Sequence, residues 1–184
     1  MRIITGRCRG RKLRGPRGRE LRPTSDRLRE TLFDILGARV RNAVFVDAFA
    51  GTGSIGLEAL SRGASEVVFI EPSPAAVRLL RQNLEICRLG EGYSILQHEI
   101  YPALHSLQRR DFKCDLFFLD PPYEWEEYGA LVGGVFRSGS IHPDSLVIVE
   151  HHRKAPVPDD GLCYRRTRLV RQGDHCLSFY ALTP

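Results

Sequence analysis

The sequence predicts an α/β fold in which helices cover both faces of a parallel sheet. Short apolar segments alternate with amphipathic segments from residue 43 onward, which is the rhythm of strands joined by helices. A glycine-rich turn follows the first predicted strand, and an Asp-Pro-Pro-Tyr turn follows the fourth. The 184 residues are enough for one ordinary domain with a small appendage.

The appendage is expected at the N-terminus, over residues 1–37. Residues 1–22 alternate loosely and are interrupted by glycines, which predicts a basic β-hairpin or strand-like arm. A helix should follow, with Ser25 as its N-cap and Gly37 as its C-cap. Leucines at helical spacing give this helix an apolar face toward the core.

Residues 38–184 are expected to form the main domain. The predicted strands occupy residues 43–46, 66–70, 93–96, 115–119, 145–150, 164–170 and 176–181. The predicted helices run near residues 55–60, 74–89, 102–109 and 126–136. Because strands and helices alternate, the strands are expected to pair mainly in parallel.

The excess positive charge is confined to one end of the chain. Residues 1–29 hold eleven basic and two acidic groups, whereas the rest of the chain holds 16 basic and 20 acidic groups. Arginine outnumbers lysine by 24 to 3, and guanidinium groups suit phosphate recognition. A solvated tail is the alternative, but apolar anchors such as Ile3, Ile4 and Leu13 favour a surface that follows phosphates. The candidate RNA contacts are Arg7, Arg9, Arg11, Lys12, Arg22 and Arg27.

The composition disfavours several classes of protein. No apolar run approaches the roughly 20 residues that a membrane-spanning helix needs. The first six residues lack the apolar core of a signal peptide, so a cytoplasmic location is expected. The five cysteines are scattered without a Cys-x-x-Cys pair, so neither a disulfide framework nor a metal site is indicated. They are expected to be small buried side chains in a reducing compartment.

The turn after the first predicted strand contains Gly51, Gly53 and Gly56 in a Gly-x-Gly-x-x-Gly pattern. Glycines let the backbone turn tightly and approach a ligand, and the pattern alone would indicate a dinucleotide site. Asp47 at the strand end changes this interpretation, because its carboxylate would repel a pyrophosphate. The same carboxylate suits the ammonium and sulfonium groups of S-adenosylmethionine, which carries no phosphate.

Further contacts to this cofactor are expected at the ends of the next strands. Glu71 ends the second predicted strand, where an acid accepts hydrogen bonds from both ribose hydroxyls. His98 and Glu99 follow the third strand, where the adenine is expected, although a loop that faces water explains them equally well. The predicted cofactor-binding residues are Asp47, Phe49, Gly51, Gly53, Glu71, Pro72, Glu99 and Asp120.

The Asp120-Pro121-Pro122-Tyr123 turn ends the fourth predicted strand, at the edge where open α/β sheets bind ligands. Two prolines fix the backbone, so the Asp120 carboxylate and the Pro121 carbonyl present two acceptors in set directions. Together they can hold the N–H groups of an exocyclic amine and turn its lone pair toward a methyl donor. Tyr123 can stack on the base. We therefore predict that Asp120, Pro121, Pro122 and Tyr123 are catalytic residues.

The chain resembles the RsmD-type 16S ribosomal RNA guanine-N2 methyltransferases along its whole length. The similarity is carried by Arg22-Pro-Thr-Ser-Asp-Arg27, Gly56-Leu-Glu-Ala-Leu-Ser-Arg-Gly-Ala64 and the Asp-Pro-Pro-Tyr turn. It implies S-adenosylmethionine-dependent methylation of the N2 amine of one guanine in the 16S rRNA of the small ribosomal subunit. It also implies a doubly wound, Rossmann-like sheet of seven strands, mostly parallel, with the last strand antiparallel. The chain departs from the family at His98-Glu99, where an Asp or Asn is expected near adenine.

Other functions remain open on the sequence alone. The same transfer could act on a tRNA guanine, a DNA adenine or a protein amide, although protein-amide enzymes usually carry Asn in place of Asp120. An inactive RNA-binding assembly factor is disfavoured by the intact Asp47, Glu71 and Asp120, and a nicotinamide-dependent oxidoreductase by Asp47. The adjacent His151 and His152 are interpreted as polar strand-end residues. A monomer is expected, since a broad basic surface must stay open to a large substrate.

Overall fold

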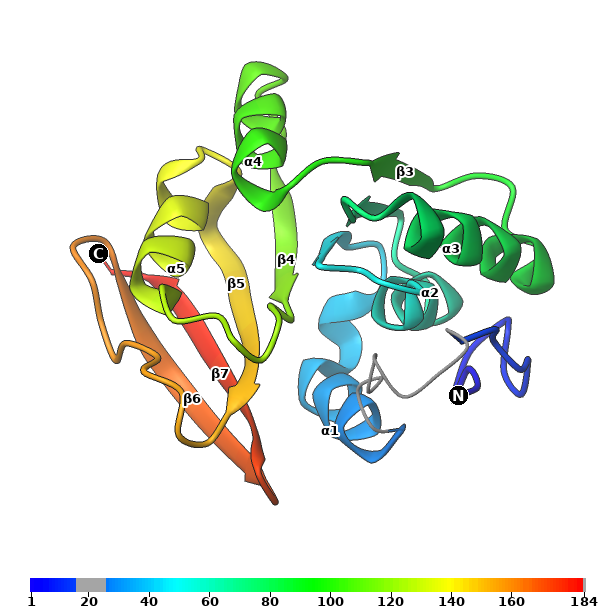
Figure 1. Ribbon diagram of the computed structural model, residues 1–184, viewed down its shortest axis with the longest axis horizontal. Helices are drawn as coiled ribbons and strands as arrows, with labels where there is room; N and C mark the ends of the chain where they lie inside the picture. The colour runs from blue at the N-terminus through cyan, green and yellow to red at the C-terminus, as the bar shows by residue number, and fades with distance from the viewer. Residues whose placement is uncertain (16–25, 184) are drawn as a thin grey trace.

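A seven-stranded sheet forms the centre of the molecule, with its strands in the order β3-β2-β1-β4-β5-β7-β6 (Figure 1). The structure is a computed structural model that describes residues 1–15 and 26–183. The strands are β1 (Val44–Ala48), β2 (Glu66–Ile70), β3 (Tyr93–Leu96), β4 (Cys114–Leu119), β5 (Ile141–His152), β6 (Tyr164–Gln172) and β7 (His175–Leu182). The first five strands are parallel, and β7 is antiparallel to both of its neighbours. The predicted sheet, including its antiparallel last strand, is confirmed.

Helices cover both faces of this sheet, as predicted. They are α1 (Asp26–Leu36), the short 3-10 helix η1 (Gly37–Val40), α2 (Ser54–Ser61), α3 (Pro74–Cys87), α4 (Ile100–Arg109) and α5 (Tyr128–Arg137). The helices α1, α2 and α3 pack on one face, where their apolar side chains meet Phe45, Phe69 and Phe118. The other face carries α4 and α5, which pack against Val46 and Phe117.

The central strands are mostly apolar because both of their faces are covered. Alternate residues of β2 point into the two cores on either side of the sheet. Parallel pairing sets Ala48 of β1 level with Ile70 of β2 and Leu119 of β4. The residues that follow these three strands therefore emerge together at one edge of the sheet.

Residues 1–15 of the N-terminal arm fold back on themselves as a hairpin, as predicted, and the predicted arm residues 16–22 lie outside the described residues. Arg2 pairs with Lys12 in an antiparallel bridge. Ile3, Cys8 and Leu13 are buried in the same core as α1. The apolar side of the arm is therefore part of the main core, and the division of the chain at residue 37 stays a prediction.

Some element boundaries differ from the predicted ones. β5 begins four residues earlier than predicted, at Ile141, because it continues to pair with β4 across a register irregularity. The third helix of the main domain begins at Ile100, since a proline is tolerated in the first turn of a helix, and α5 begins two residues late, at Tyr128. Gly37 follows α1 with a φ of 50°, as expected of a C-cap. The predicted N-cap, Ser25, lies outside the described residues.

Within residues 1–15 and 26–183, no helix has both the length and the apolar character that crossing a membrane requires. The same ranges hold no group of three or more His, Cys, Asp or Glu side chains placed to bind a metal ion. All five cysteines are free thiols, and all are buried as predicted except the half-buried Cys163.

Candidate active site

Three acidic side chains gather where β1, β2 and β4 end. The last residues of the three strands are aligned, so Glu71 and Asp120 emerge on either side of the residue that follows β1. Asp47 lies within β1, one residue before its end. The fold thus brings together three of the four acids predicted as cofactor contacts, at the carboxyl edge where α/β sheets bind ligands. We call these three residues the acidic cluster.

Asp47 is buried, with 2% of its surface exposed. Its Oδ2 accepts a hydrogen bond of 2.8 Å from the Gly56 N–H in the first turn of α2. Burial raises the pKa of the Asp47 carboxyl well above its ordinary value, and the charges of Asp120 and Glu71 raise it further, against the opposing effect of the Gly56 bond. A cation bound beside Asp47 would favour its ionised form and lower this pKa.

Both carboxylate oxygens of Glu71 are held by backbone groups. Oε2 accepts the Gly51 N–H and Oε1 accepts the Ser73 N–H, each at 2.8 Å. An ionised carboxylate has about four acceptor positions, so each oxygen retains one. Glu71 therefore fixes the glycine turn and can still accept two hydrogen bonds from a diol such as a ribose.

The glycine turn is pressed closely against its neighbours. A Cβ on Gly53, whose φ is 80°, would lie 2.2 Å from Leu80 Cδ1 of α3. A Cβ on Gly56 would lie 2.3 Å from the Phe69 ring of β2. Phe49, between β1 and the turn, has a φ of 62°, which is unusual for a bulky residue. Glycine is therefore required here by packing as well as by backbone conformation.

The Asp-Pro-Pro-Tyr turn directly follows β4. Asp120 is half-buried, Pro121 is buried and Pro122 is exposed. The Pro122 carbonyl accepts the Trp125 N–H at 2.9 Å, while no backbone N–H of the described residues bonds to the Pro121 carbonyl. The Tyr123 ring is 60% exposed. The two predicted acceptors, Asp120 and Pro121, thus lie beside an aromatic ring that is open to a substrate.

Trp125, the single tryptophan of the chain, is not among the site residues predicted from the sequence. Its ring packs edge-on against Phe49 with centroids 5.4 Å apart, which joins the loops after β1 and β4. Its Nε1 is buried and has no hydrogen-bond partner in the described part of the chain. A buried donor of this kind can be satisfied by a polar ligand. Its position two residues after Tyr123 is the signal that the sequence offers.

Two histidines contact the Tyr123 ring, and they too are absent from the predicted site. The His152 ring lies 5.8 Å and the His175 ring 6.2 Å from it, measured between centroids. The Nδ1 of His175 is 3.2 Å from Oε1 of the buried Glu150. The neighbouring His151 is hydrogen-bonded within the sheet instead. His152 and His175 therefore connect the ends of β5 and β7 to the Asp-Pro-Pro-Tyr turn.

Two further predicted cofactor residues lie at the same edge but are less enclosed. Pro72, next to Glu71, is half-buried. Glu99 is exposed at the N-cap position of α4, and its side chain makes no capping hydrogen bond. The Leu96 carbonyl at the end of β3 accepts the Glu71 N–H at 3.1 Å, which keeps this loop beside the acidic cluster. An adenine contact at Glu99 stays a prediction.

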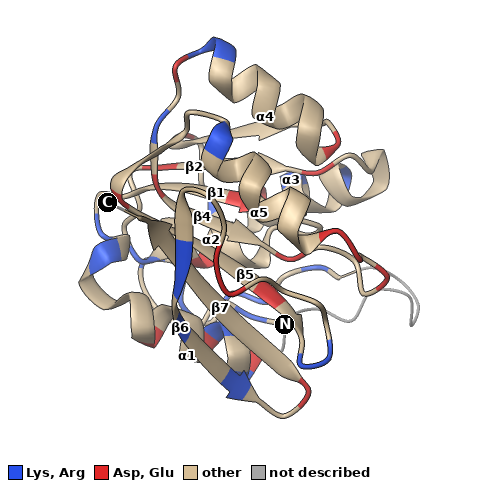
Figure 2. Ribbon diagram, turned by 90° about the vertical axis from the view of Figure 1, so that its left-hand side faces the viewer, with Lys and Arg blue, Asp and Glu red and all other residues tan. Residues whose placement is uncertain are grey.

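The predicted RNA contacts lie on the arm and at the start of α1, and Figure 2 marks the basic residues in blue. Those exposed on the arm are Arg7, Arg9 and Lys12. Arg11 is half-buried and donates to the Ile86 carbonyl of α3, so part of its hydrogen-bonding capacity is used within the protein. Arg22 lies outside the described residues. The role of these side chains in binding RNA stays a prediction.

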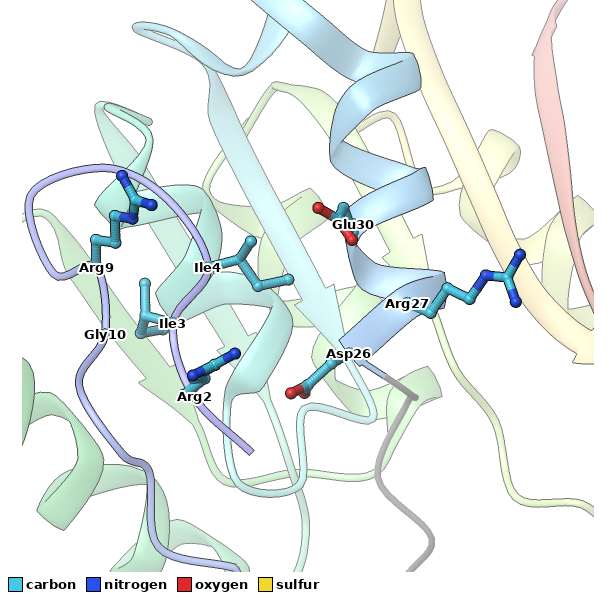
Figure 3. Close-up of a pocket in the computed structure, with 8 residues that line it drawn as sticks. All are labelled: Arg2, Ile3, Ile4, Arg9, Gly10, Asp26, Arg27 and Glu30. Atoms are coloured by element: carbon cyan, nitrogen blue, oxygen red, sulfur yellow. The ribbon is translucent and has the colours of Figure 1, made fainter.

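A cavity of about 380 Å³ opens between the arm and α1 (Figure 3). It is lined by Arg2, Ile3, Ile4, Arg9, Gly10, Asp26, Arg27 and Glu30. Figure 3 shows the Arg27 side chain pointing away from Arg2 and Arg9. The lining includes no residue of the acidic cluster or of the Asp-Pro-Pro-Tyr turn, so this cavity is separate from the candidate active site.

Known proteins match the chain over nearly its whole length. The family described as "Conserved hypothetical protein 95" matches residues 1–181. The chain belongs to this family. Because the match covers residues 1–181, it includes the arm as well as the sheet.

The relatives confirm the RsmD-type resemblance. A protein of Haemophilus influenzae named Ribosomal RNA small subunit methyltransferase D is 34% identical over 158 residues, which are 85% of this chain and 81% of the relative. Its namesake in Escherichia coli K12 is also 34% identical, over 86% of this chain and 78% of the relative. The solved structure of yhhF, a candidate methyltransferase from Escherichia coli, is 31% identical with a TM-score of 0.83 and covers 99% of this chain and 97% of its own.

Proposed function

We propose that this protein transfers the methyl group of S-adenosylmethionine to the exocyclic N2 amine of a guanine in the 16S rRNA of the small ribosomal subunit. The observation that carries the proposal is the acidic cluster beside the Asp-Pro-Pro-Tyr turn. Relatives named as small-subunit rRNA methyltransferases support the reaction class and an rRNA substrate. The choice of guanine N2 rests on the sequence resemblance to the RsmD type.

The acidic cluster fits a cationic cofactor. S-adenosylmethionine carries an ammonium and a sulfonium group, and positive charge beside Asp47 would offset the repulsion from Asp120 and Glu71. Glu71 retains acceptor positions for ribose hydroxyls, and Trp125 supplies a buried donor next to Phe49. A dinucleotide would instead add the negative charge of its pyrophosphate to the same cluster.

The Asp-Pro-Pro-Tyr turn can perform the transfer by positioning and by stabilising charge. Bound S-adenosylmethionine supplies an electrophilic methyl group. The Asp120 carboxylate and the Pro121 carbonyl accept the two N–H groups of the amine, direct its lone pair and stabilise the positive charge that develops on nitrogen. Asp120 can then take up the proton that leaves the nitrogen. The exposed Tyr123 ring stacks on the base.

The target base must leave its stack to reach this turn, at a cost of a few kcal/mol unless it is already single-stranded. Phosphate contacts from the exposed Arg7, Arg9 and Lys12 can offset that cost. We infer that the protein acts in the cytoplasm. We also infer that it acts as a monomer, because the basic surface must remain open to a ribosomal substrate.

The test is transfer of a labelled methyl group to small subunits that lack the modification, to naked 16S rRNA and to bulk tRNA, followed by identification of the labelled nucleoside. N2-methylguanosine from subunits or 16S rRNA is the expected product. Label found in tRNA alone, or as N6-methyladenosine, would overturn the assigned substrate while retaining the methyl-transfer chemistry.

A further inference from the structure

A second basic surface lies on the outermost strand of the sheet. β6 contains Arg165, Arg166, Arg168 and Arg171 and no acidic residue, and blue segments mark it in Figure 2. Arg166 is half-buried and bonded to Asp159, whereas the other three arginines are exposed. β6 ends the sheet, with β7 as its partner in the strand order. The chain after residue 29 has more acidic than basic groups, and this net negative charge conceals the local cluster of arginines on β6.

A register shift in β6 turns two of these arginines to the same face. Arg165 pairs with Ala181 and Arg168 pairs with Phe179, and these two partners are two residues apart on β7. Directly opposed residues point to one face, as do residues two apart along a strand. Arg165 and Arg168 are three residues apart and would point to opposite faces of a regular strand. The extra residue, Thr167, therefore places both guanidinium groups on one side.

The face in question is the one that carries α1. Phe179 belongs to the core that α1 helps to form, and Val170 of β6 packs against the same core. The Oγ1 of Thr31 on α1 lies 3.4 Å from Oε1 of Gln172 at the end of β6. Arg27 is exposed one helical turn before Thr31, on the same side of the helix. Its side chain points away from the arginines of the arm (Figure 3).

We propose that Arg165 and Arg168, continued by Arg27 on α1, form a surface that binds phosphates of the RNA substrate independently of the arm. None of the three side chains forms an ion pair within residues 1–15 and 26–183. Guanidinium groups exposed on one face suit the backbone of a nucleic acid. The inference rests on the proposed function for its RNA substrate, and it concerns binding rather than methyl transfer.

Arginines on an edge strand can also serve to prevent two sheet edges from pairing. That role requires charge on β6 but no particular face of the sheet. A register shift can itself protect a sheet edge, but that role does not require Arg165 and Arg168 to share a face, so their alignment favours a surface built to contact a partner.

The test is binding of a labelled, unmodified 16S rRNA transcript, followed by fluorescence anisotropy over a series of KCl concentrations. R165A/R168A is expected to weaken binding and to reduce the slope of log affinity against log salt by about 2, roughly one for each lost phosphate contact. R165K/R168K keeps both charges and should keep the slope. R109A/R110A removes two exposed arginines where α4 leads into β4, and should also keep the slope.

An unchanged slope in R165A/R168A, with thermal unfolding as in the wild type, would overturn the proposal. Dimerisation of R165A/R168A on size-exclusion chromatography with an unchanged slope would also overturn it, and would assign these arginines to protection of the sheet edge. Methyl transfer by the wild-type protein to the same transcript and to unmodified small subunits is measured in parallel. Its absence with both substrates would contradict the proposed function, whereas the slopes report on the RNA surface by themselves.

Discussion

Two buried carboxylates lie near opposite ends of α2, in contrasting surroundings. Glu58, near the last turn, is fully buried, and its oxygens are surrounded by donors and cations. These partners are Ile4 N at 2.8 Å, Thr5 N at 2.9 Å, Arg62 Nε at 2.8 Å and Arg29 Nε at 3.9 Å. Asp47 accepts the Gly56 N–H of the first turn and faces the charges of Asp120 and Glu71.

The difference separates a structural acid from a functional one. At Glu58, positive charge and hydrogen bonds compensate for burial, and these contacts join the arm and α1 to α2. At Asp47, the like charges of neighbouring acids add to the cost of burial. Such a site strains the free protein and is stabilised when a cationic ligand binds.

The largest effect on stability is expected from Glu58→Ala. The change removes a carboxylate that is paired with the buried Arg29 and leaves the N–H groups of Ile4 and Thr5 without their acceptor, so the free energy of unfolding should fall by about 3–5 kcal/mol. Urea unfolding measures the loss, and Glu58→Gln offers a milder step if the alanine variant does not fold. Glu85→Ala, at an exposed acid of α3, is the control. Equal losses in Glu58→Ala and Glu85→Ala would contradict the structural role.

Asp120→Ala is expected to act on the reaction rather than on the fold. Methyl transfer should fall by about 10²–10³-fold, as when one group that stabilises developing charge is lost. Single-turnover transfer to 16S rRNA measures this, and the affinity for S-adenosylhomocysteine should be largely retained. Asp144→Ala removes an exposed acid at the start of β5 and serves as the control. Loss of cofactor binding in Asp120→Ala would assign Asp120 to the cofactor instead.

Asp47→Asn should weaken S-adenosylhomocysteine binding by about tenfold or more, roughly 1.4 kcal/mol, without destabilising the protein. The amide oxygen of Asn can still accept the Gly56 N–H, and the neutral side chain avoids the repulsion from Asp120 and Glu71. Thermal unfolding of the free protein and calorimetric titration measure the two quantities. A loss of stability like that of Glu58→Ala would show that the two acids do not differ.

The same substitution should also change how stability depends on pH. Because the pKa of Asp47 is raised in the folded protein, the folded state holds this proton more tightly than the unfolded chain. Its contribution to stability therefore falls as pH rises from the ordinary carboxyl pKa through the raised folded value, and is constant above that. Asn does not titrate, so the Asp47→Asn variant does not lose this stability. Its free energy of unfolding relative to the wild type should therefore increase as pH rises from the ordinary carboxyl pKa to the raised one. Parallel curves of stability against pH for the wild type and Asp47→Asn would contradict a raised pKa of Asp47.

A smaller effect is expected from His175→Ala, which removes one of the two rings beside Tyr123. The KM for 16S rRNA should rise about 2–10-fold with less change in kcat, since an aromatic contact contributes roughly 0.5–1.5 kcal/mol. His175→Phe keeps a ring and should restore the wild-type KM. His142→Ala, whose imidazole contacts Asp115 at the start of β4, is the control. Unchanged kinetics in His175→Ala would show that the contact does not position Tyr123.

The acidic cluster was predictable from the sequence, because the carboxyl ends of neighbouring parallel strands meet at one edge of the sheet. Strand and helix periodicity is local, so it also predicted the sheet and its helices. The contacts of Trp125 with Phe49, and of His152 and His175 with Tyr123, were not predictable, because they join segments that are far apart in the sequence.

Glu58 and β6 show the same limit of sequence-based prediction, which cannot foresee contacts between distant segments. Glu58 stands in an apolar helix where Arg62 is its local partner, but nothing local indicates the backbone donors that come from the arm. Strand periodicity predicted β6 but not the extra residue at Thr167, because the register of a strand depends on its neighbour. The shared face of Arg165 and Arg168 therefore became visible with the structure.

The most direct test of the account is the proton balance of cofactor binding. S-adenosylhomocysteine is titrated calorimetrically into the wild type and Asp47→Asn between pH 5 and 8, in buffers of different ionisation enthalpy. A bound ammonium beside Asp47 should lower its raised pKa, so the wild type is expected to release protons below that pKa and Asp47→Asn to release fewer and bind more weakly. Equal affinity and equal proton release in the two proteins would contradict a cationic cofactor at the acidic cluster.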